Sequence, residues 1–360
     1  MGVQQQSRLT PKERRKRQQY LSATIITCIA VAMVFGTLHV VKLGANRMDD
    51  MKARATYDLT EMKDHLRAAG EDITRHQAHE EQQKAAKTYA WNELDSLLSA
   101  EQWQQLAEMV EIPAGEFLMG TDSERSDKHN RPQHKVYLDK FYIDKYLVTN
   151  AEYARFVVAT KHRAPLDWVD GTIPDEKYFH PVTMVTWYDA QDYCGWEGKR
   201  LPTEAEWEKA ARGMDGRRWP WGNSMDAGKL NTYYHVGSTT EVMTYKNGIS
   251  PYGVYDMAGN VSEWTGSDFA PYEGSDAPAD VFQPKKVMAT SGADEAMKVG
   301  DLVAVEGVFK VRRGGSWKSD PFSTSTYHRN FSMPYYASDF FGFRCATERS
   351  ETGAVVERKQ

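Results

Sequence analysis

The sequence predicts an α+β protein with little regular secondary structure in its main domain, preceded by a single transmembrane helix and a helical stalk. An uncharged apolar run occupies residues 21–41, and residues 47–110 contain one glycine and no proline. From Met109 onward the chain is rich in aromatic residues, glycine and short alternating stretches. The first pattern is typical of a membrane span, the second of long helices, and the third of short strands joined by loops.

The charge is small overall but concentrated at the start of the chain. The 360 residues carry a formal net charge of -5, and 41% of them are hydrophobic, enough to bury a substantial core. Lysines and arginines nevertheless crowd residues 8–17, where Glu13 is the only acid. This is a basic tail on an acidic protein, and we expect no nucleic acid among its partners.

The apolar run is about as long as the roughly 20 residues that a helix needs to cross a bilayer. A buried core helix would carry a clearer polar stripe, and a cleavable signal peptide would have a shorter apolar region. Basic residues before a span stay in the cytoplasm. We therefore expect a cytoplasmic tail at 1–20, a transmembrane helix in contact with lipid at 21–43, and a periplasmic remainder. The setting is a single-pass protein of a bacterial inner membrane.

Residues 44–108 are predicted to form the helical stalk. Its narrow apolar stripe fits either a partner helix or a solvated arm. His76, His79 and Glu80 share one helix face, which is more typical of a solvated surface than of a metal site. Ser99 and Gln102 have capping-box spacing and predict a helix that presents an apolar face. That face would consist of Trp103, Leu106 and Val110.

The domain itself is predicted at residues 109–347, with a tail at 348–360. Alternation within residues 134–144 predicts strands. Two helices are expected, one at 187–196 and one that begins after Pro202 and Thr203, where Glu204 and Glu206 suit the positive end of the helix dipole. We expect loops to dominate the rest.

Seven segments, in this order, resemble the formylglycine-generating enzyme family. They are IPAGEFLMG (112–120), HKVYLDKFYIDKYLVTNAEYARFV (134–157), HPVTMVTWYDAQDYCGWEGKRLPTEAEWEKAARG (180–213), WPWGN (219–223), SPYGVYDMAGNVSEW (250–264), RRGGSW (312–317) and FGFRCA (341–346). The resemblance implies a domain distantly similar to a C-type lectin fold. Because that family includes oxidases, iron enzymes and binding or assembly proteins, the fold alone does not choose the function.

The resemblance also shows what this chain lacks. The family's oxidases bind copper(I) with two cysteines after the Gly-Gly-Ser motif, and here Ser319 stands at the first position and Thr324 near the second. Hydroxyl groups are hard, protonated ligands that neither bind copper(I) nor exchange disulfides. We therefore expect no copper and no catalytic residue at these positions.

Ser262 stands where the family usually has a tryptophan near the substrate cleft. A residual cleft would be lined by Ser316, His328 and Arg329 together with Ser262, with Tyr327 nearby. His328 would be its acid or base. An iron site would need a separate His-rich helical domain, which the chain does not contain, so we expect no iron.

Cys28 lies in the predicted span, and the resemblance implies that Cys194 and Cys345 form a structural disulfide. Bridges are common in extracytoplasmic, loop-rich domains. Closing a loop of roughly 150 residues would stabilise the fold by around 4 to 5 kcal/mol by the chain-entropy argument. The alternative is two buried free thiols.

The resemblance further implies a calcium site. Asp256 and Glu263 would supply carboxylate oxygens, and Gly259 and Val261 backbone carbonyls, which are the hard ligands that calcium prefers. The alternative is an Asp-initiated turn. A second family site would begin at Asn231 and Thr232, but its acidic partner is missing, and we do not predict it.

Residues 267–311 look like a surface insertion and are the best candidate for a partner-binding element. With the lost cysteines and the anchor, they favour a non-catalytic accessory subunit or scaffold that binds and stabilises a larger membrane or periplasmic protein complex. The alternative is a periplasmic maturation or tailoring oxidase that uses non-cysteine chemistry in the same cleft. A lectin-like carbohydrate-binding module rests on fold analogy and has the least support.

Overall fold

The structure is a computed structural model that describes residues 91–283, 287–288, 302–303 and 308–349. All of these residues belong to one unit. Within these ranges, no helix has the length and apolar character that a membrane span requires. The predicted tail and span, the stalk up to residue 90 and the three residues of the stalk's histidine cluster lie outside the described residues.

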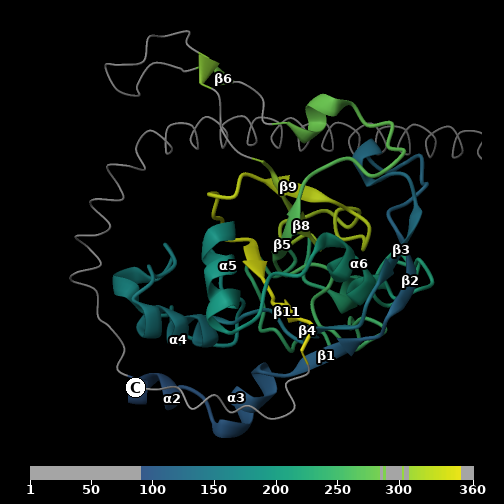
Figure 1. Cartoon of the computed structure of the whole chain (residues 1–360). Helices are drawn as coiled ribbons and strands as arrows, with labels where there is room; N and C mark the ends of the chain where they lie inside the picture. Colours follow the sequence, from purple (N-terminus) through teal and green to yellow (C-terminus); the bar gives the residue numbers. More distant parts are fainter. Residues whose placement is uncertain (1–90, 284–286, 289–301, 304–307, 350–360) are drawn as a thin grey trace, which may run out of the picture. The chain divides into compact units, whose positions relative to one another are not determined.

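Small sheets hold the domain together (Figure 1). A four-stranded sheet has the order β10-β5-β8-β9, and a three-stranded sheet has the order β1-β4-β11. Two further pairs are β2–β3 and β6–β7. The bounds of the strands are β1 Met109–Ile112, β2 Gly115–Met119, β3 His134–Leu138, β4 Phe141–Asp144, β5 Ser262–Asp268, β6 Val287–Met288, β7 Leu302–Val303, β8 Lys310–Arg313, β9 Asn330–Ser332, β10 Phe341–Phe343 and β11 Ala346–Thr347.

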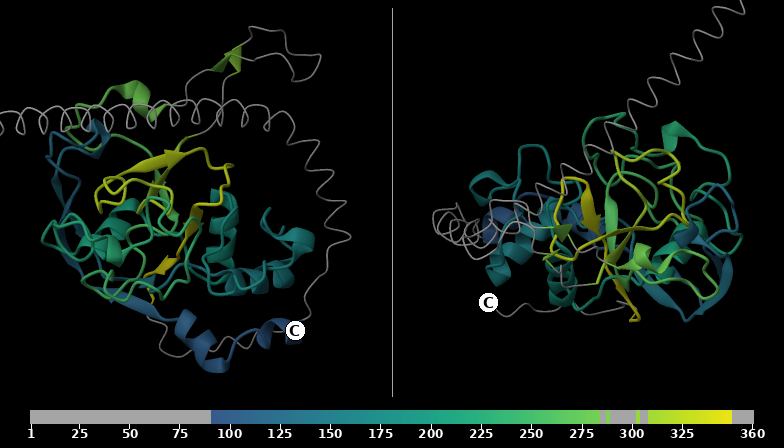
Figure 2. Two further views of the ribbon diagram at one scale, coloured as in Figure 1. Left: turned by 180° about the vertical axis from the view of Figure 1, so that it is seen from behind. Right: turned by 90° about the horizontal axis from the view of Figure 1, so that it is seen from above.

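Five α-helices are described, and four of them begin with a capping box. Their bounds are α2 Trp91–Asp95, α3 Ala100–Leu106, α4 Asn150–Thr160, α5 Trp187–Trp196 and α6 Glu204–Arg212, and the 3-10 helices are Lys128–Asn130, Val169–Gly171, Ala227–Lys229 and Ala279–Phe282. In Figure 1, α4 and α5 lie on one side of the sheets, with α6 and the β2–β3 hairpin on the other. The view from behind in Figure 2 agrees.

Both helices predicted inside the domain are confirmed, but the prediction of only two was wrong because α4 was missed. Its signal was present in Thr149 and Glu152, whose side chains form a capping box at its start. The predicted strands at 134–144 are confirmed as β3 and β4. Val110 does not belong to the helix that begins after Ser99, because it lies in β1 and pairs with Ile143.

The end of the predicted stalk packs onto the domain. Leu94, Leu98 and Leu106 are buried in its apolar clusters. Arg155 of α4 forms an ion pair with Asp95 and stacks on the Trp103 ring at 3.4 Å. The packed unit therefore begins before residue 109.

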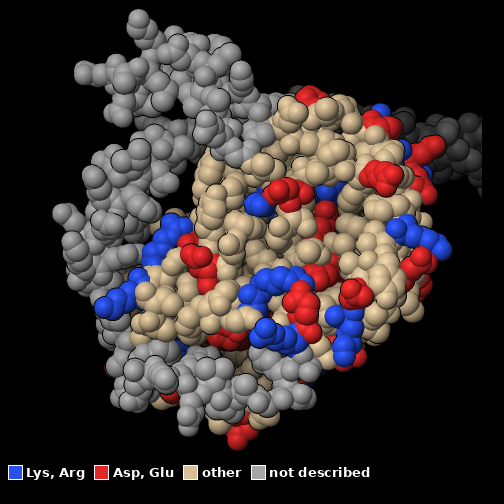
Figure 3. All heavy atoms as spheres, viewed as in Figure 1, with Lys and Arg blue, Asp and Glu red and all other residues tan. Residues whose placement is uncertain are grey.

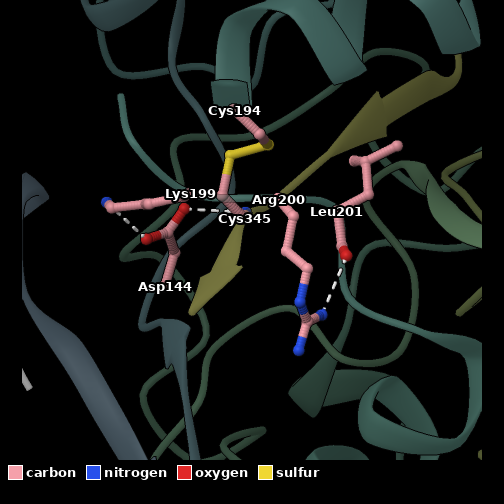
Figure 4. The surroundings of a disulfide bond; sticks show 6 residues. All are labelled: Asp144, Cys194, Lys199, Arg200, Leu201 and Cys345. Atoms are coloured by element: carbon pink, nitrogen blue, oxygen red, sulfur yellow. Dashed lines mark hydrogen bonds and ion pairs between the residues drawn. A yellow bond between two sulfur atoms is a disulfide. The ribbon is translucent and has the colours of Figure 1, made fainter. Parts of the chain in front are cut away.

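The predicted disulfide is confirmed. Cys194 in α5 is bonded to Cys345 after β10, across 151 positions of sequence and with 5.6 Å between the two Cα atoms (Figure 4). Both residues belong to the largest apolar cluster. Beside the bridge, Asp144 accepts from the Cys345 backbone N–H and pairs with Lys199. The bridge thus ties α5 to the segment between β10 and β11, which are edge strands of the two larger sheets.

Helix α6 is buried although its sequence, EAEWEKAAR, is largely charged. Glu208 accepts from the Gly120 N–H and from Arg212, and it also pairs with Arg313 of β8. Arg212 donates to the carbonyls of Leu118 and Gly120. Because buried charges are tolerated only when paired, α6 fixes the position of each loop that supplies a partner.

Replacing Glu208 with Ala should therefore be strongly destabilising. It would leave the buried Arg212 and Arg313 without their shared carboxylate, and breaking such a pair costs about 3 to 5 kcal/mol of unfolding free energy. Urea denaturation measures the loss. The control is Glu116→Ala, whose ion pair with Lys135 is exposed and contributes less than about 1 kcal/mol. Similar losses in the two variants would contradict this interpretation of α6.

Candidate functional site

Three loops meet at the position of the missing cysteines. The loop that follows β8, residues 314–319, is joined to residues 256–261 by two backbone bonds, Gly259 N–H to the Gly314 carbonyl and Trp317 N–H to the Asn260 carbonyl. Tyr233 and Tyr234 donate their backbone N–H groups to the Ser319 and Trp317 carbonyls at 2.9 and 2.7 Å. Backbone hydrogen bonds between loops, rather than strand pairing in a sheet, therefore hold the residues of the site in place.

The two positions that would carry cysteines hold engaged hydroxyl groups. Ser319 Oγ accepts from the Ser316 N–H at 2.9 Å and lies 3.2 Å from Ser316 Oγ. Thr324 Oγ1 donates to the Pro321 carbonyl at 2.8 Å and accepts from the Trp219 indole at 3.2 Å. Ser316 and Thr324 are buried. The hydrogen bonds of the Ser316 and Ser319 hydroxyls thus hold residues 314–319 together, and we call this segment the closed serine loop.

The structure brings Ser316 of the predicted cleft together with Ser319, the first of the two lost cysteine positions, whereas the described contacts of Arg329 are with other groups. Arg329 is buried, and both oxygens of Glu204 accept from its guanidinium at 2.7 and 2.9 Å. It also donates to the carbonyls of His129 and Ala270. Arg329 is therefore a structural cross-link between α6 and two loops. Tyr327 is nearly buried and lies under the Arg212 guanidinium.

The described contacts of the His328 and Ser262 side chains do not include the serine pair. The His328 ring lies 3.5 Å from the Asn130 side chain and packs edge-on near His129. Burial lowers the pKa of His328 to about 4, so its ring is neutral at physiological pH. Ser262 begins β5, and its buried hydroxyl has no hydrogen-bond partner among the described residues.

The predicted calcium ligands fit a cation in part. Asp256 is buried, its Oδ2 has no hydrogen-bond partner among the described residues, and burial raises its pKa to about 8. An unsatisfied buried carboxylate oxygen is what a hard cation binds. Both oxygens of Glu263, however, accept from the Arg344 guanidinium, at 2.6 and 3.0 Å. The fit is therefore good at Asp256 and poor at Glu263.

The turn that carries these positions is tightly constrained. Gly259 has φ +83°, and a Cβ there would lie 2.3 Å from the Asn231 carbonyl oxygen, so only glycine fits. Asn231 also accepts from the Asn260 N–H, while Thr232 Oγ1 bonds to the Ser319 carbonyl at 2.6 Å. Asn231 and Thr232 thus connect the turn to the serine loop. Within the described residues, no group of three or more His, Cys, Asp or Glu side chains could hold a metal.

Exposed aromatic side chains surround the closed serine loop. Tyr233, Tyr234 and Phe322 are 53%, 58% and 60% exposed, and Val236 is 50% exposed. The Tyr234 ring packs edge-on against Trp317, and Phe322 lies under the Arg218 guanidinium. We call Tyr233, Tyr234, Val236 and Phe322 the aromatic rim. Sequence reasoning missed it, because nothing in a loop sequence shows which aromatic rings stay exposed.

The described parts of the predicted insertion, residues 267–311, are integrated into the domain at both ends. Phe269, Phe282 and Val311 form a buried cluster. Phe269 stacks on Phe331 of β9 with ring centroids 4.2 Å apart. Strands β6 and β7 form a small pair within this range. Its role in partner binding stays a prediction.

Comparison with known proteins places this geometry in context. Residues 95–349 match the family described as the sulfatase-modifying factor enzyme 1-like domain. A serine/threonine-protein kinase, pkn1 of Chlamydia caviae, is 34% identical over 255 residues, which cover 66% of this chain and 38% of that relative. The inactive C-alpha-formylglycine-generating enzyme 2 of Bos taurus is 31% identical over 303 residues, which cover 68% of this chain and 89% of that relative.

Among solved structures, PvdO from Pseudomonas aeruginosa is similar with a TM-score of 0.50 and 27% identity, covering 67% of this chain and 94% of PvdO. The chain spans only 38% of the length of the kinase-named relatives.

The neutral state of the half-buried His328 predicts acid sensitivity. The unfolded chain protonates a histidine near pH 6.5, whereas the folded protein resists protonation until about pH 4. The unfolded state therefore binds more protons in this window, and stability is lost as the pH falls through it. Urea unfolding should show that His328→Gln loses less stability than the wild type between these pH values, by up to about 3 kcal/mol. The control is His235→Gln, at an exposed histidine, which should behave like the wild type. If the stability of His328→Gln falls with pH as steeply as that of the wild type, the assignment is contradicted.

Calcium binding by Asp256 stays a prediction that thermal unfolding can check. Excess calcium should raise the melting temperature of the wild type relative to a chelator-treated sample, because a ligand that binds only the folded state stabilises it. Asp256→Asn should abolish that shift and, without calcium at neutral pH, should be about as stable as the wild type, since the raised pKa of Asp256 already leaves its carboxyl largely uncharged. The exposed Asp139→Asn variant should keep the shift. A calcium effect that survives Asp256→Asn would rule out Asp256 as a ligand.

Proposed function

The chain belongs to the sulfatase-modifying factor enzyme 1-like family, and from that premise we propose that it is a non-catalytic, membrane-anchored accessory subunit or scaffold. Residues 21–43 hold it in a bacterial inner membrane, and the domain lies on the periplasmic side. There it binds and stabilises a larger protein complex.

The observation that carries the proposal is the closed serine loop. Ser316, Ser319 and Thr324 bond to one another or to nearby groups, and two of the three are buried. The described partners of the Ser316 and Ser319 hydroxyls are each other and backbone amides, with no acid or base in contact. A serine needs an adjacent base to act as a nucleophile. The site therefore supports binding better than covalent chemistry.

The aromatic rim supplies the binding surface. Exposed tyrosine and phenylalanine rings bury large apolar areas on association at a small cost in side-chain entropy. Tyr233 and Tyr234 both adopt left-handed backbone, with φ of 53° and 59°. Left-handed backbone is unfavourable for side chains of this size. Backbone hydrogen bonds to the serine loop hold both residues in this conformation, and both rings are exposed. This geometry favours a protein partner.

The alternative is a tailoring oxidase with non-cysteine chemistry in the same cleft. Its proposed polar groups were Ser316, His328 and Arg329. Arg329 is committed to Glu204, and the His328 ring faces Asn130. These contacts lend the alternative no support, whereas the aromatic rim supports binding.

Crosslinking tests the proposed function. A photoreactive phenylalanine analogue at Tyr234 of the full chain, in native membranes, should capture one protein partner. The double variant Tyr233→Ser and Tyr234→Ser should lose co-purification with it, because the rim loses its two largest rings. Val169→Ser, at an apolar side chain 76% exposed in a different loop, should retain the partner.

Two results would contradict this proposal. One is a full chain that purifies from native membranes alone and gives no crosslink. The other is a partner retained equally by the rim variant and by Val169→Ser.

A further inference from the structure

A surface hollow lies on the side of the domain formed by α4 and α5. Its volume is about 990 Å³, and its walls come from the end of α4, the exposed face of α5 and the strand region around Gly266 and Lys310. Lys199, Arg200 and Leu201, which line it, follow the helix that carries the disulfide (Figure 4). Neither the serine loop nor the aromatic rim contributes to it.

The lining combines aromatic rings with groups that donate and accept hydrogen bonds. Trp187 and Trp196 supply apolar surface, while Gln191 and Thr160 supply polar atoms of both kinds. Sugars have this same mixture, because a pyranose ring has an apolar C–H face and hydroxyl groups around its edge that both donate and accept. The volume is within the range of small-molecule sites. The lining therefore suits a saccharide better than a purely apolar ligand.

The charge of the lining favours an acidic ligand. Lys161, Arg200 and Lys310 line the hollow with Lys199, against a single acid among the described residues, Asp192. Lys199, Arg200 and Lys310 already pair with acids outside the lining, whereas Lys161 has no ion pair among the described residues. On the face shown in Figure 3, basic and acidic side chains mostly lie next to one another. Among the described residues of the lining, Lys161 is therefore the lysine that could neutralise an anion.

Gly195 is the second observation that points to a ligand. It lies in the last turn of α5 and lines the hollow, and a Cβ built on it would meet nothing within 4 Å. Glycine weakens a helix relative to alanine, and here no neighbouring atom in the protein requires it. An added methyl group would enter open space beside the other lining residues. The missing side chain leaves room for a bound group.

Lys161 is the third observation. It ends α4 with φ 60°, in the left-handed region where glycine is the usual residue. The lysine side chain adds strain to the backbone there and is exposed at the rim. Strain of this kind is typical of sites where the side chain has a function.

From these observations, we propose that the hollow binds a saccharide that carries an acidic substituent. The sugar face packs on the tryptophan surface, its hydroxyl groups bond to Gln191 and Asp192, and its anionic group pairs with Lys161. This binding activity is separate from the protein-partner surface at the aromatic rim.

A glycan array probed with the purified full chain provides the first test. The array should contain neutral glycans and matched glycans that carry carboxylate, sulfate or phosphate groups, so that the arms distinguish the sources of the negative charge. We expect retention of acidic glycans and not of their neutral counterparts, with weaker binding at high salt. Titration calorimetry with the best-retained acidic glycan then gives the dissociation constant.

Two variants make the test specific, because neither removes a packing contact. Gly195→Ala should add a methyl group to the lining of the hollow, and Lys161→Gly should remove the positive charge at its edge. Each should weaken binding at least tenfold. Both should have a melting temperature equal to or above the wild type, since alanine favours the helix and glycine relieves the strained backbone. Lys161→Arg, which keeps the charge, should bind like the wild type.

Tyr234→Ser, at the aromatic rim, should also bind the glycan like the wild type, so failure of this inference is distinct from failure of the proposed function. Three results would overturn the inference. They are no retention on the array, equal binding of neutral glycans, and wild-type affinity in both Gly195→Ala and Lys161→Gly. A triglutamate peptide that binds as tightly as the glycan would overturn the assignment to a saccharide.

Discussion

The structure depends on the buried charges of α6 and the requirement that each be paired. Lys209 donates to the carbonyls of Pro113 and Gly115 at 2.7 and 2.9 Å, and burial lowers its pKa. Glu208 and Arg212 hold the chain around Gly120, and Glu204 holds Arg329. A domain with so few strand residues satisfies much of its loop backbone through side chains rather than sheet ladders. Helix α6 therefore takes the place that a central sheet occupies in more regular folds.

The buried contacts and the surface loops use different residues, and this explains how the site can change while the fold persists. The ion pairs of α6, the pair between Glu263 and Arg344, and the disulfide all lie beneath the loops, and none of them uses a residue of the aromatic rim. Ser319 and Thr324 replace thiols with hydroxyls that bond locally, so the loop keeps its shape without a metal. Function in such a domain resides in the loops that the frame presents, as it does in many other folds.

Local signals in the sequence predicted what depends on a few neighbouring residues. Capping boxes identify helix starts, as Thr203 does for α6, and the family resemblance identified the pairing of Cys194 with Cys345. What depends on distant partners could not be predicted. The sequence EAEWEKAAR is typical of a solvated helix, and its burial follows only from partners up to 125 positions away, such as Arg329. Arg329 was assigned to a cleft for the same reason, because its acidic partner is remote in sequence.

Left-handed backbone occurs in the frame and at both surfaces, as well as at Glu176 and Met184. Asp256 and Asn260 adopt left-handed backbone inside a turn that must pass close to Asn231, so their strain is explained by packing. Lys161, Tyr233 and Tyr234 also adopt it with exposed side chains, although the Tyr234 ring packs edge-on against Trp317. Glycine at these three positions would relieve the strain and leave the frame intact. These side chains are kept at a cost to stability, on loops that the buried ion pairs already hold in place. They are best explained by contacts with molecules outside this chain.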